Sequence, residues 1–223
     1  MQSNTGFSTV RDERMQLWAE FSAIYLLAPA AMALVLPPGA LFPALFAVTA
    51  VGLWLLHRTR GFAWADLKPR RWRTDWPLVG GFAVLTGALV LALVLLREPQ
   101  AFLRPGRDNP ALLAAILLLY PFLSALPQEI VFRPLFFRRY GALLPRGRAA
   151  LAVNAAVFSL AHLMYWNWVV AAMTFAGGLI FAWAYEVRRS FALAVLLHSV
   201  AGWLIFGLGL GVYFYSGNVE RPF

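Results

Sequence analysis

Four ionisable side chains lie within segments of the chain that are otherwise apolar: Glu129, Arg133, His162 and His198. A charge or a titratable ring at the depth of a bilayer is costly, so such residues pair with one another or line a wet cavity. We therefore expect these four to form one functional site. A carboxylate and imidazoles in such a cavity can activate water by general acid–base catalysis or stabilise an oxyanion.

The spacing of Glu129 and Arg133 predicts an ion pair. Residues four apart lie on the same face of a helix and are close enough to pair. A purely structural salt bridge that holds neighbouring helices together is the alternative interpretation. A glutamate with two histidines is also a ligand set of catalytic zinc, but the chain has no HExxH motif, so a zinc site would be based on the residue count alone.

The elements that position these residues are predicted to be transmembrane helices. The chain is 61% hydrophobic, whereas soluble domains are about 45–50% apolar, and its apolar segments approach the ~20 residues that cross a bilayer. We predict an all-α, polytopic membrane bundle with about seven transmembrane helices. They are placed near Trp18–Leu36, Ala40–His57, Pro77–Leu96, Ala111–Phe137, Ala149–Met164, Trp166–Tyr185 and Phe191–Tyr215.

This pattern predicts one transmembrane domain over residues 17–215, with a motif-bearing core at 111–214. A polar cytoplasmic tail (1–16) precedes it and a short tail (216–223) follows it. Because the first 16 residues lack an apolar core, we expect no removable signal peptide.

The distribution of Lys and Arg predicts the orientation in the membrane. Of the 19 basic residues, 14 fall on the same side as the N-terminus, and only Arg97, Arg104, Arg107 and Arg221 fall on the other. The positive-inside rule then predicts N-in, C-out. The loop from Arg58 to Trp76 combines Trp with basic residues, which is typical of a segment lying on anionic headgroups. Nucleic-acid binding is not expected, because the charges are scattered over several short loops.

Prolines interrupt the predicted helix that carries Glu129. Pro121, Pro127 and Pro134 lie within or beside its polar stretch. Proline inside a helix removes a backbone hydrogen bond and kinks the helix, and in a bilayer the freed carbonyls need protein or water as partners. We therefore expect residues 121–134 to face the interior of the bundle.

Three short motifs follow one another in the C-terminal half. Residues 128–133 (QEIVFR) resemble an EExxxR motif, residues 158–162 (FSLAH) match FxxxH, and residues 198–202 (HSVAG) resemble HxxxN. With these motifs in this order on successive apolar segments, residues 111–214 are similar to the CAAX-protease and bacteriocin-processing family. This family, also called the Abi family, consists of intramembrane glutamic endopeptidases.

The resemblance implies a role for each motif residue. In the family, a glutamate and the histidine of the second motif activate water, and the histidine and asparagine of the third motif stabilise the oxyanion. By this resemblance His162 assists the base, His198 donates to the oxyanion, and Arg133 pairs with Glu129. The resemblance also implies a hydrophobic or lipidated peptide substrate, no cofactor, and a bacterial inner membrane, in keeping with the Arg-rich, cysteine-free composition.

Two positions differ from the family pattern. Gln128 stands where the first motif glutamate is expected, and Gly202 stands where the asparagine is expected. A neutral amide cannot take a proton from water, and glycine has no side-chain donor. Three functions therefore remain open: an endopeptidase with Glu129 as the base, a pseudo-protease that binds peptide or lipid as a membrane scaffold, and a zinc-dependent membrane hydrolase.

Overall fold

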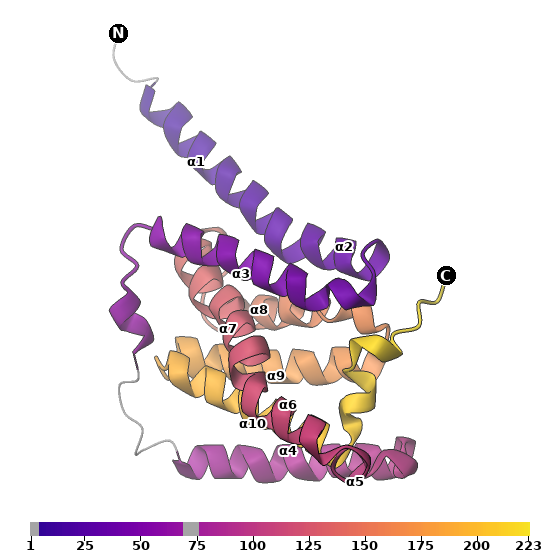
Figure 1. Cartoon of the computed structure of the whole chain (residues 1–223). Helices are drawn as coiled ribbons and strands as arrows, with labels where there is room; N and C mark the ends of the chain where they lie inside the picture. Colours follow the sequence, from indigo (N-terminus) through magenta and orange to yellow (C-terminus); the bar gives the residue numbers. More distant parts are fainter. Residues whose placement is uncertain (1–4, 69–75) are drawn as a thin grey trace.

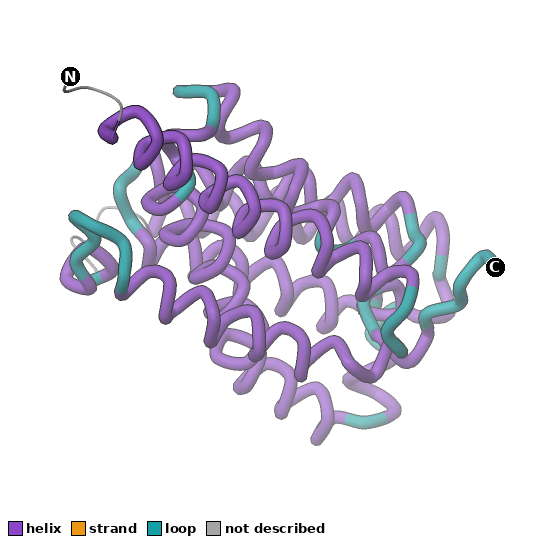
Figure 2. The backbone as a smooth tube through the Cα atoms, turned by 90° about the horizontal axis from the view of Figure 1, so that it is seen from above, coloured by secondary structure: helices purple, strands orange, loops and turns teal. Residues whose placement is uncertain are grey.

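The computed structural model describes residues 5–68 and 76–223, and over these residues it consists of helices and loops without strands (Figures 1 and 2). Its seven helical segments that are long and apolar enough to cross a membrane are Asp12–Leu34, Pro38–His57, Trp76–Arg97, Pro110–Arg139, Arg148–Tyr165, Trp168–Glu186 and Phe191–Leu208. The predicted all-α, polytopic fold and the number of spans are confirmed.

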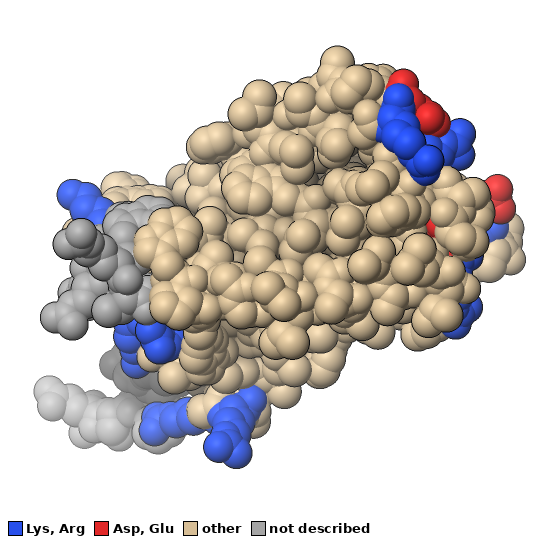
Figure 3. All heavy atoms as spheres, turned by 90° about the horizontal axis from the view of Figure 1, so that it is seen from below, with Lys and Arg blue, Asp and Glu red and all other residues tan. Residues whose placement is uncertain are grey.

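Charged side chains lie at the two ends of the bundle, and a broad belt free of Lys, Arg, Asp and Glu separates them on the face shown in Figure 3. An uncharged belt between two charged ends is what a bilayer selects. The chain is an integral membrane protein. Its predicted orientation stays a prediction, and part of the basic loop on which it depends (residues 69–75) lies outside the described residues.

The spans are built from helices of several kinds. The α-helices are α1 (Thr5–Ser22), α2 (Ala28–Leu34), α3 (Leu41–His57), α4 (Trp76–Arg97), α5 (Arg104–Asp108), α6 (Pro110–Tyr120), α7 (Leu126–Ile130), α8 (Arg148–Leu160), α9 (Trp168–Glu186) and α10 (Phe191–Leu208). The π-helical turns are η1 (Ala23–Leu27), η5 (Pro121–Ala125) and η6 (Val131–Arg139). Short 3₁₀ turns lie at η2 (Pro38–Ala40), η3 (Trp64–Leu67), η4 (Pro99–Ala101), η7 (Gly141–Leu143), η8 (Leu163–Tyr165), η9 (Leu210–Tyr213) and η10 (Ser216–Asn218).

The fourth span, from α6 to η6, runs through the middle of the bundle. It packs against α3 on one side and α10 on the other, while α4 covers the outer face of α10 (Figure 1). The first span packs against η6 and the residue after it through an aromatic cluster of Phe21, Tyr25, Phe136 and Tyr140, whose rings make edge-to-face and tilted contacts. This packing buries the end of the fourth span that carries the motif residues.

The prolines of the fourth span coincide with π-helical turns rather than with a break. Pro121 begins η5 and Pro134 lies inside η6, and π-helical turns are frequent at functional sites. Two carbonyls of η6 have partners from other spans: the Tyr25 hydroxyl donates to Val131 O at 2.7 Å, and Asn154 Nδ2 donates to Phe132 O at 2.7 Å. The expectation that residues 121–134 face the interior is confirmed for the end of this stretch, because residues 131–136 are all buried, and it is wrong near its start, where Phe122 and Leu123 are exposed.

Two predicted helix ends are wrong. The last transmembrane helix ends at Leu208 instead of Tyr215, because Gly209 adopts a left-handed φ of +109° and its Cα lies against the carbonyl of Ala101, where a Cβ would overlap. The first helix begins at Thr5, so residues 5–16 of the predicted polar tail continue the first span as helix.

Candidate active site

The structure brings Glu129, Arg133 and His198 together in the interior of the bundle. Glu129 lies on α7, Arg133 lies one turn later on η6, and His198 comes from the middle of α10. The side chains of Glu129 and Arg133 are fully buried. That of His198 is only 7% exposed.

Glu129 and Arg133 form the predicted ion pair. Arg133 Nε donates to Oε2 at 2.8 Å, and Nη2 donates to Oε1 at 3.3 Å. Such a two-point contact between guanidinium and carboxylate is stronger and more directional than a neutral hydrogen bond. The pair keeps both groups charged inside the bundle and fixes the orientation of the carboxylate.

His198 is the third member of this network. Its Nδ1 lies 2.9 Å from Glu129 Oε1. The carboxylate paired with Arg133 accepts a hydrogen bond, so we assign the imidazole proton to Nδ1; Nε2 then keeps a free lone pair. The ring stacks on Phe181, with centroids 4.9 Å apart and an interplanar angle of 11°, and meets the edge of Phe158 at 5.6 Å. These contacts hold the imidazole in one orientation.

Asn154 of α8 completes the network. It was not among the site residues predicted from the sequence. Its amide oxygen accepts from Arg133 Nη1, its amide nitrogen donates to Phe132 O, and its side chain is fully buried. The signal was present, because Asn154 is a strongly polar residue within an apolar span, the same feature that singled out Glu129. Asn154 fixes the end of the guanidinium that Glu129 does not contact.

Replacing Asn154 with alanine is expected to destabilise the protein. The change removes the Asn154 amide from both Arg133 Nη1 and the Phe132 carbonyl and leaves these two groups only their long contact with each other at 3.4 Å. A buried polar group that loses its partner costs about 1–3 kcal/mol. Thermal unfolding in detergent micelles measures the effect. Asn218→Ala, at an exposed asparagine, is the control and should change stability by less than about 0.5 kcal/mol. Equal melting temperatures for Asn154→Ala and the parent would contradict this role.

His162 lies beside this network rather than within it. It lies two residues beyond the end of α8, its Nδ1 is 2.8 Å from the Phe158 carbonyl, and its ring stacks on Tyr165. Among residues 5–68 and 76–223, no hydrogen bond joins it to Glu129 or His198. Both histidine rings contact Phe158 edge-on, so this aromatic ring links the two sides of the site.

Gln128 turns away from Glu129. Its Nε2 donates to Ser124 Oγ at 3.0 Å, one turn earlier on the same span. Consecutive residues of a helix point about 100° apart, so only one of the two can face Arg133 and His198, and Glu129 does. The Gln128 amide instead belongs to a polar face with Ser124 and Tyr120, which lie four and eight residues earlier on the same span.

The position of the missing motif asparagine is filled by Tyr120. Its ring lies directly against Gly202, and a Cβ at this position would overlap Cε1 and Cζ of the tyrosine. The same ring meets His198 edge-on, with centroids 6.0 Å apart. Glycine at position 202 therefore makes room for an aromatic side chain next to His198.

The site residues do not form a metal centre in their observed arrangement. Within the described part of the chain, no three His, Asp or Glu side chains converge in a way that could hold a metal ion. Glu129 uses its oxygens for Arg133 and His198, and His162 points its Nδ1 at a backbone carbonyl. The zinc-ligand alternative gains no support from this geometry.

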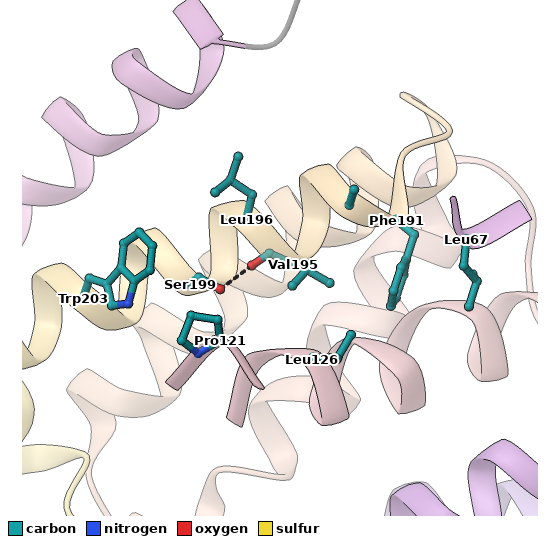
Figure 4. A pocket seen from close by; sticks show the side chains of 9 residues that line it. Leu67, Pro121, Leu126, Phe191, Val195, Leu196, Ser199 and Trp203 are labelled. Carbon is teal, nitrogen blue, oxygen red and sulfur yellow. Dashed lines mark hydrogen bonds between the residues drawn. The ribbon is translucent and has the colours of Figure 1, made fainter. Parts of the chain in front are cut away.

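An apolar groove of about 320 Å³ lies between α10, the fourth span and η3 (Figure 4). It is lined by Leu67, Pro121, Leu126, Phe191, Ala192, Val195, Leu196, Ser199 and Trp203. Its one hydroxyl, on Ser199, donates to the Val195 carbonyl at 2.8 Å. Neither Glu129 nor His198 lines this groove, so it is separate from the candidate active site.

Comparison with known families identifies the region that carries the three motifs. Residues 110–204 match the family model described as "Type II CAAX prenyl endopeptidase Rce1-like". These residues are therefore similar to the CAAX proteases. The matched residues contain the candidate-site positions from Tyr120 to Gly202, which confirms the resemblance drawn from the motifs and supports a membrane protease. No curated protein and no solved structure matches the chain.

Proposed function

We propose that this CAAX-protease-like protein is an intramembrane endopeptidase in which His198 is the general base. The observation that carries the proposal is the hydrogen bond between His198 Nδ1 and Glu129 Oε1, within a carboxylate–guanidinium pair that is fully buried. A carboxylate that fixes the tautomer of an imidazole, and stabilises the imidazolium once it forms, is a recurring catalytic arrangement.

Glu129 is better suited to orient the histidine than to take a proton from water. Both of its oxygens accept hydrogen bonds, and none of its surface is exposed. A general base must come within hydrogen-bonding reach of the proton that it removes. Nε2 of His198 has the free lone pair that this step needs, so the base moves from the glutamate of the family pattern to the imidazole.

The reaction then follows the ordinary course of peptide hydrolysis. A water molecule gives a proton to His198 Nε2 and attacks the scissile carbonyl carbon, which forms a tetrahedral oxyanion. Imidazolium, paired with Glu129, then gives this proton to the leaving amine as the C–N bond breaks. We propose a lipidated or otherwise hydrophobic peptide as the substrate, because the site lies within membrane-spanning segments, and a bacterial inner membrane as the location.

Replacing Gln128 with glutamate tests this function. The protein is reconstituted in liposomes with a prenylated fluorogenic peptide, and initial rates are compared. If His198 is the base, the parent hydrolyses the peptide, and Gln128→Glu does not exceed the parent rate, because residue 128 faces Ser124 and not His198. Gln128→Ala is the control for loss of the side chain. A Gln128→Glu rate at least tenfold above the parent would contradict the proposal.

A second candidate is a peptide-binding or lipid-binding scaffold. The observation that favours it is that two of the four family positions with catalytic chemistry have changed: Gln128 is bonded to Ser124, and Gly202 is covered by Tyr120. On this hypothesis the parent binds the prenylated peptide without cleaving it, and Gln128→Glu creates hydrolysis from none. The same liposome experiment therefore distinguishes the two functions.

A further inference from the structure

We infer that the Tyr120 hydroxyl donates a hydrogen bond to the oxyanion of the substrate, and that Ser124 and Gln128 orient this hydroxyl. The inference rests on the proposed endopeptidase function. It assigns a catalytic residue outside the three motifs and gives Gln128 a positioning role.

Tyr120 lies in direct contact with Gly202. A base at His198 needs a nearby donor for the charge that develops on the carbonyl oxygen, and Gly202 has no side chain to provide one. The Tyr120 ring occupies the space above Gly202 that any larger residue would fill. A phenol O–H is a hydrogen-bond donor, so the tyrosine brings a donor to the same place.

Tyr120 also lies beside His198, the proposed base. Its ring meets His198 edge-on, with centroids 6.0 Å apart, and it packs against Phe206 on its other side at 5.8 Å. These aromatic contacts, with Gly202 beneath the ring, restrict the orientation of the side chain. A fixed donor in apolar surroundings stabilises a developing charge far more than the same donor does in water.

Hydrogen bonds along the helix face of Tyr120, Ser124 and Gln128 can all point the same way, from Gln128 toward Tyr120. Tyr120, Ser124 and Gln128 follow one another at intervals of four residues. Gln128 Nε2 has protons and no lone pair to offer, so it donates to Ser124 Oγ, at 3.0 Å. The Ser124 hydroxyl proton is then free to point toward the Tyr120 oxygen, which lies one helical turn earlier on the same span. The Tyr120 proton is left for the substrate.

This polarity explains why glutamine suits position 128. An ionised glutamate only accepts hydrogen bonds, so the Ser124 hydroxyl would donate its hydrogen bond to the glutamate. Ser124 could then no longer donate to Tyr120, and the tyrosine proton would turn toward Ser124. No proton is transferred by Tyr120 in the proposed step: its O–H remains intact and the carbonyl oxygen accepts the hydrogen bond as it gains charge.

Tyr120→Phe in the full-length protein tests the inference. The change removes only the hydroxyl, and kcat for the prenylated peptide is expected to fall by about 10²–10³-fold, the usual effect of removing one oxyanion donor. KM and the thermal midpoint should stay close to the parent values. Tyr213→Phe is the matched control, because it also removes a hydrogen-bonded hydroxyl, the one that donates to Glu98 at 2.9 Å, and its kcat should equal the parent's.

A donor swap supplies the second arm. Tyr120→Ala empties the space above Gly202, and adding Gly202→Asn to it places an amide donor there. The double variant should recover at least tenfold in kcat over Tyr120→Ala alone, as expected if a donor at this place is worth a hundredfold or more. For Ser124, a positioning residue, Ser124→Ala should lower kcat without changing KM, and Ser124→Thr should restore it.

Three results would overturn the inference. A parent-like kcat for Tyr120→Phe would refute Tyr120 as the donor while leaving the endopeptidase function intact. No recovery in the double variant, with the protein folded by its thermal midpoint, would show that the place above Gly202 does not contribute a donor. A parent that binds the peptide without cleaving it would refute the proposed function and this inference together.

Discussion

Replacing His198 with glutamine is expected to lower kcat by about 10²–10⁴-fold, the usual contribution of a general base. Glutamine keeps polar atoms near Glu129, but it has no nitrogen that can take a proton from water. The loss should therefore appear in kcat, while binding of the peptide, measured by fluorescence anisotropy in liposomes, stays close to that of the parent. Initial rates with the prenylated fluorogenic peptide check the prediction.

Glu129→Gln should reproduce much of this loss for a different reason. An amide can donate to Nδ1 of His198 and so favour the wrong tautomer, in which Nε2 carries the proton and cannot act as the base. Ser199→Ala is the control, because Ser199 neighbours His198 in sequence but lines the apolar groove and not the candidate active site. A parent-like kcat for His198→Gln, combined with loss for Glu129→Gln, would return the role of base to Glu129.

Replacing Arg133 with methionine is expected to destabilise the folded protein by about 3–5 kcal/mol. Methionine fills much of the volume of the arginine, but it leaves the carboxylate of Glu129 buried without its opposite charge. It also removes the donor to the amide oxygen of Asn154. Thermal and denaturant unfolding in detergent micelles, followed by circular dichroism, measures the change.

The double variant Glu129→Gln/Arg133→Met separates loss of the charge pair from loss of packing. Removing both charges together should recover a large part of the stability that Arg133→Met alone loses, because no unpaired charge is then buried. Arg104→Met, at an exposed pair with Asp108, is the control and should cost less than about 1 kcal/mol. A double variant no more stable than Arg133→Met would argue that packing, and not charge, dominates.

The two departures from the family motifs are each matched by a change in their surroundings. Gln128 has a partner in Ser124, and Gly202 has one in the Tyr120 ring. Both matches lie on the face of the fourth span that runs from Tyr120 to Gln128. The motif positions of the CAAX-protease family therefore cannot be interpreted separately in this chain, because the residues that complement them stand outside the motifs.

Much of the architecture was determined by local features of the sequence. Apolar segments of sufficient length predicted the seven spans, because a bilayer requires continuous apolar helices. The four-residue spacing of Glu129 and Arg133 predicted their ion pair, since helix geometry alone brings such residues together. The prolines of the fourth span predicted a stretch with carbonyls that need partners, and Tyr25 and Asn154 supply them.

The composition of the site was decided by the tertiary structure. Glu129 and His198 are 69 residues apart, and no periodicity predicts the crossing of α7 and α10 that joins them. The sequence also left open which of Gln128 and Glu129 faces inward, because the π-helical turns on both sides of α7 shift the helix face from its regular course. Tyr120 covers Gly202 for the same reason: the packing of two helices, and not the order of residues, sets which side chains share a space.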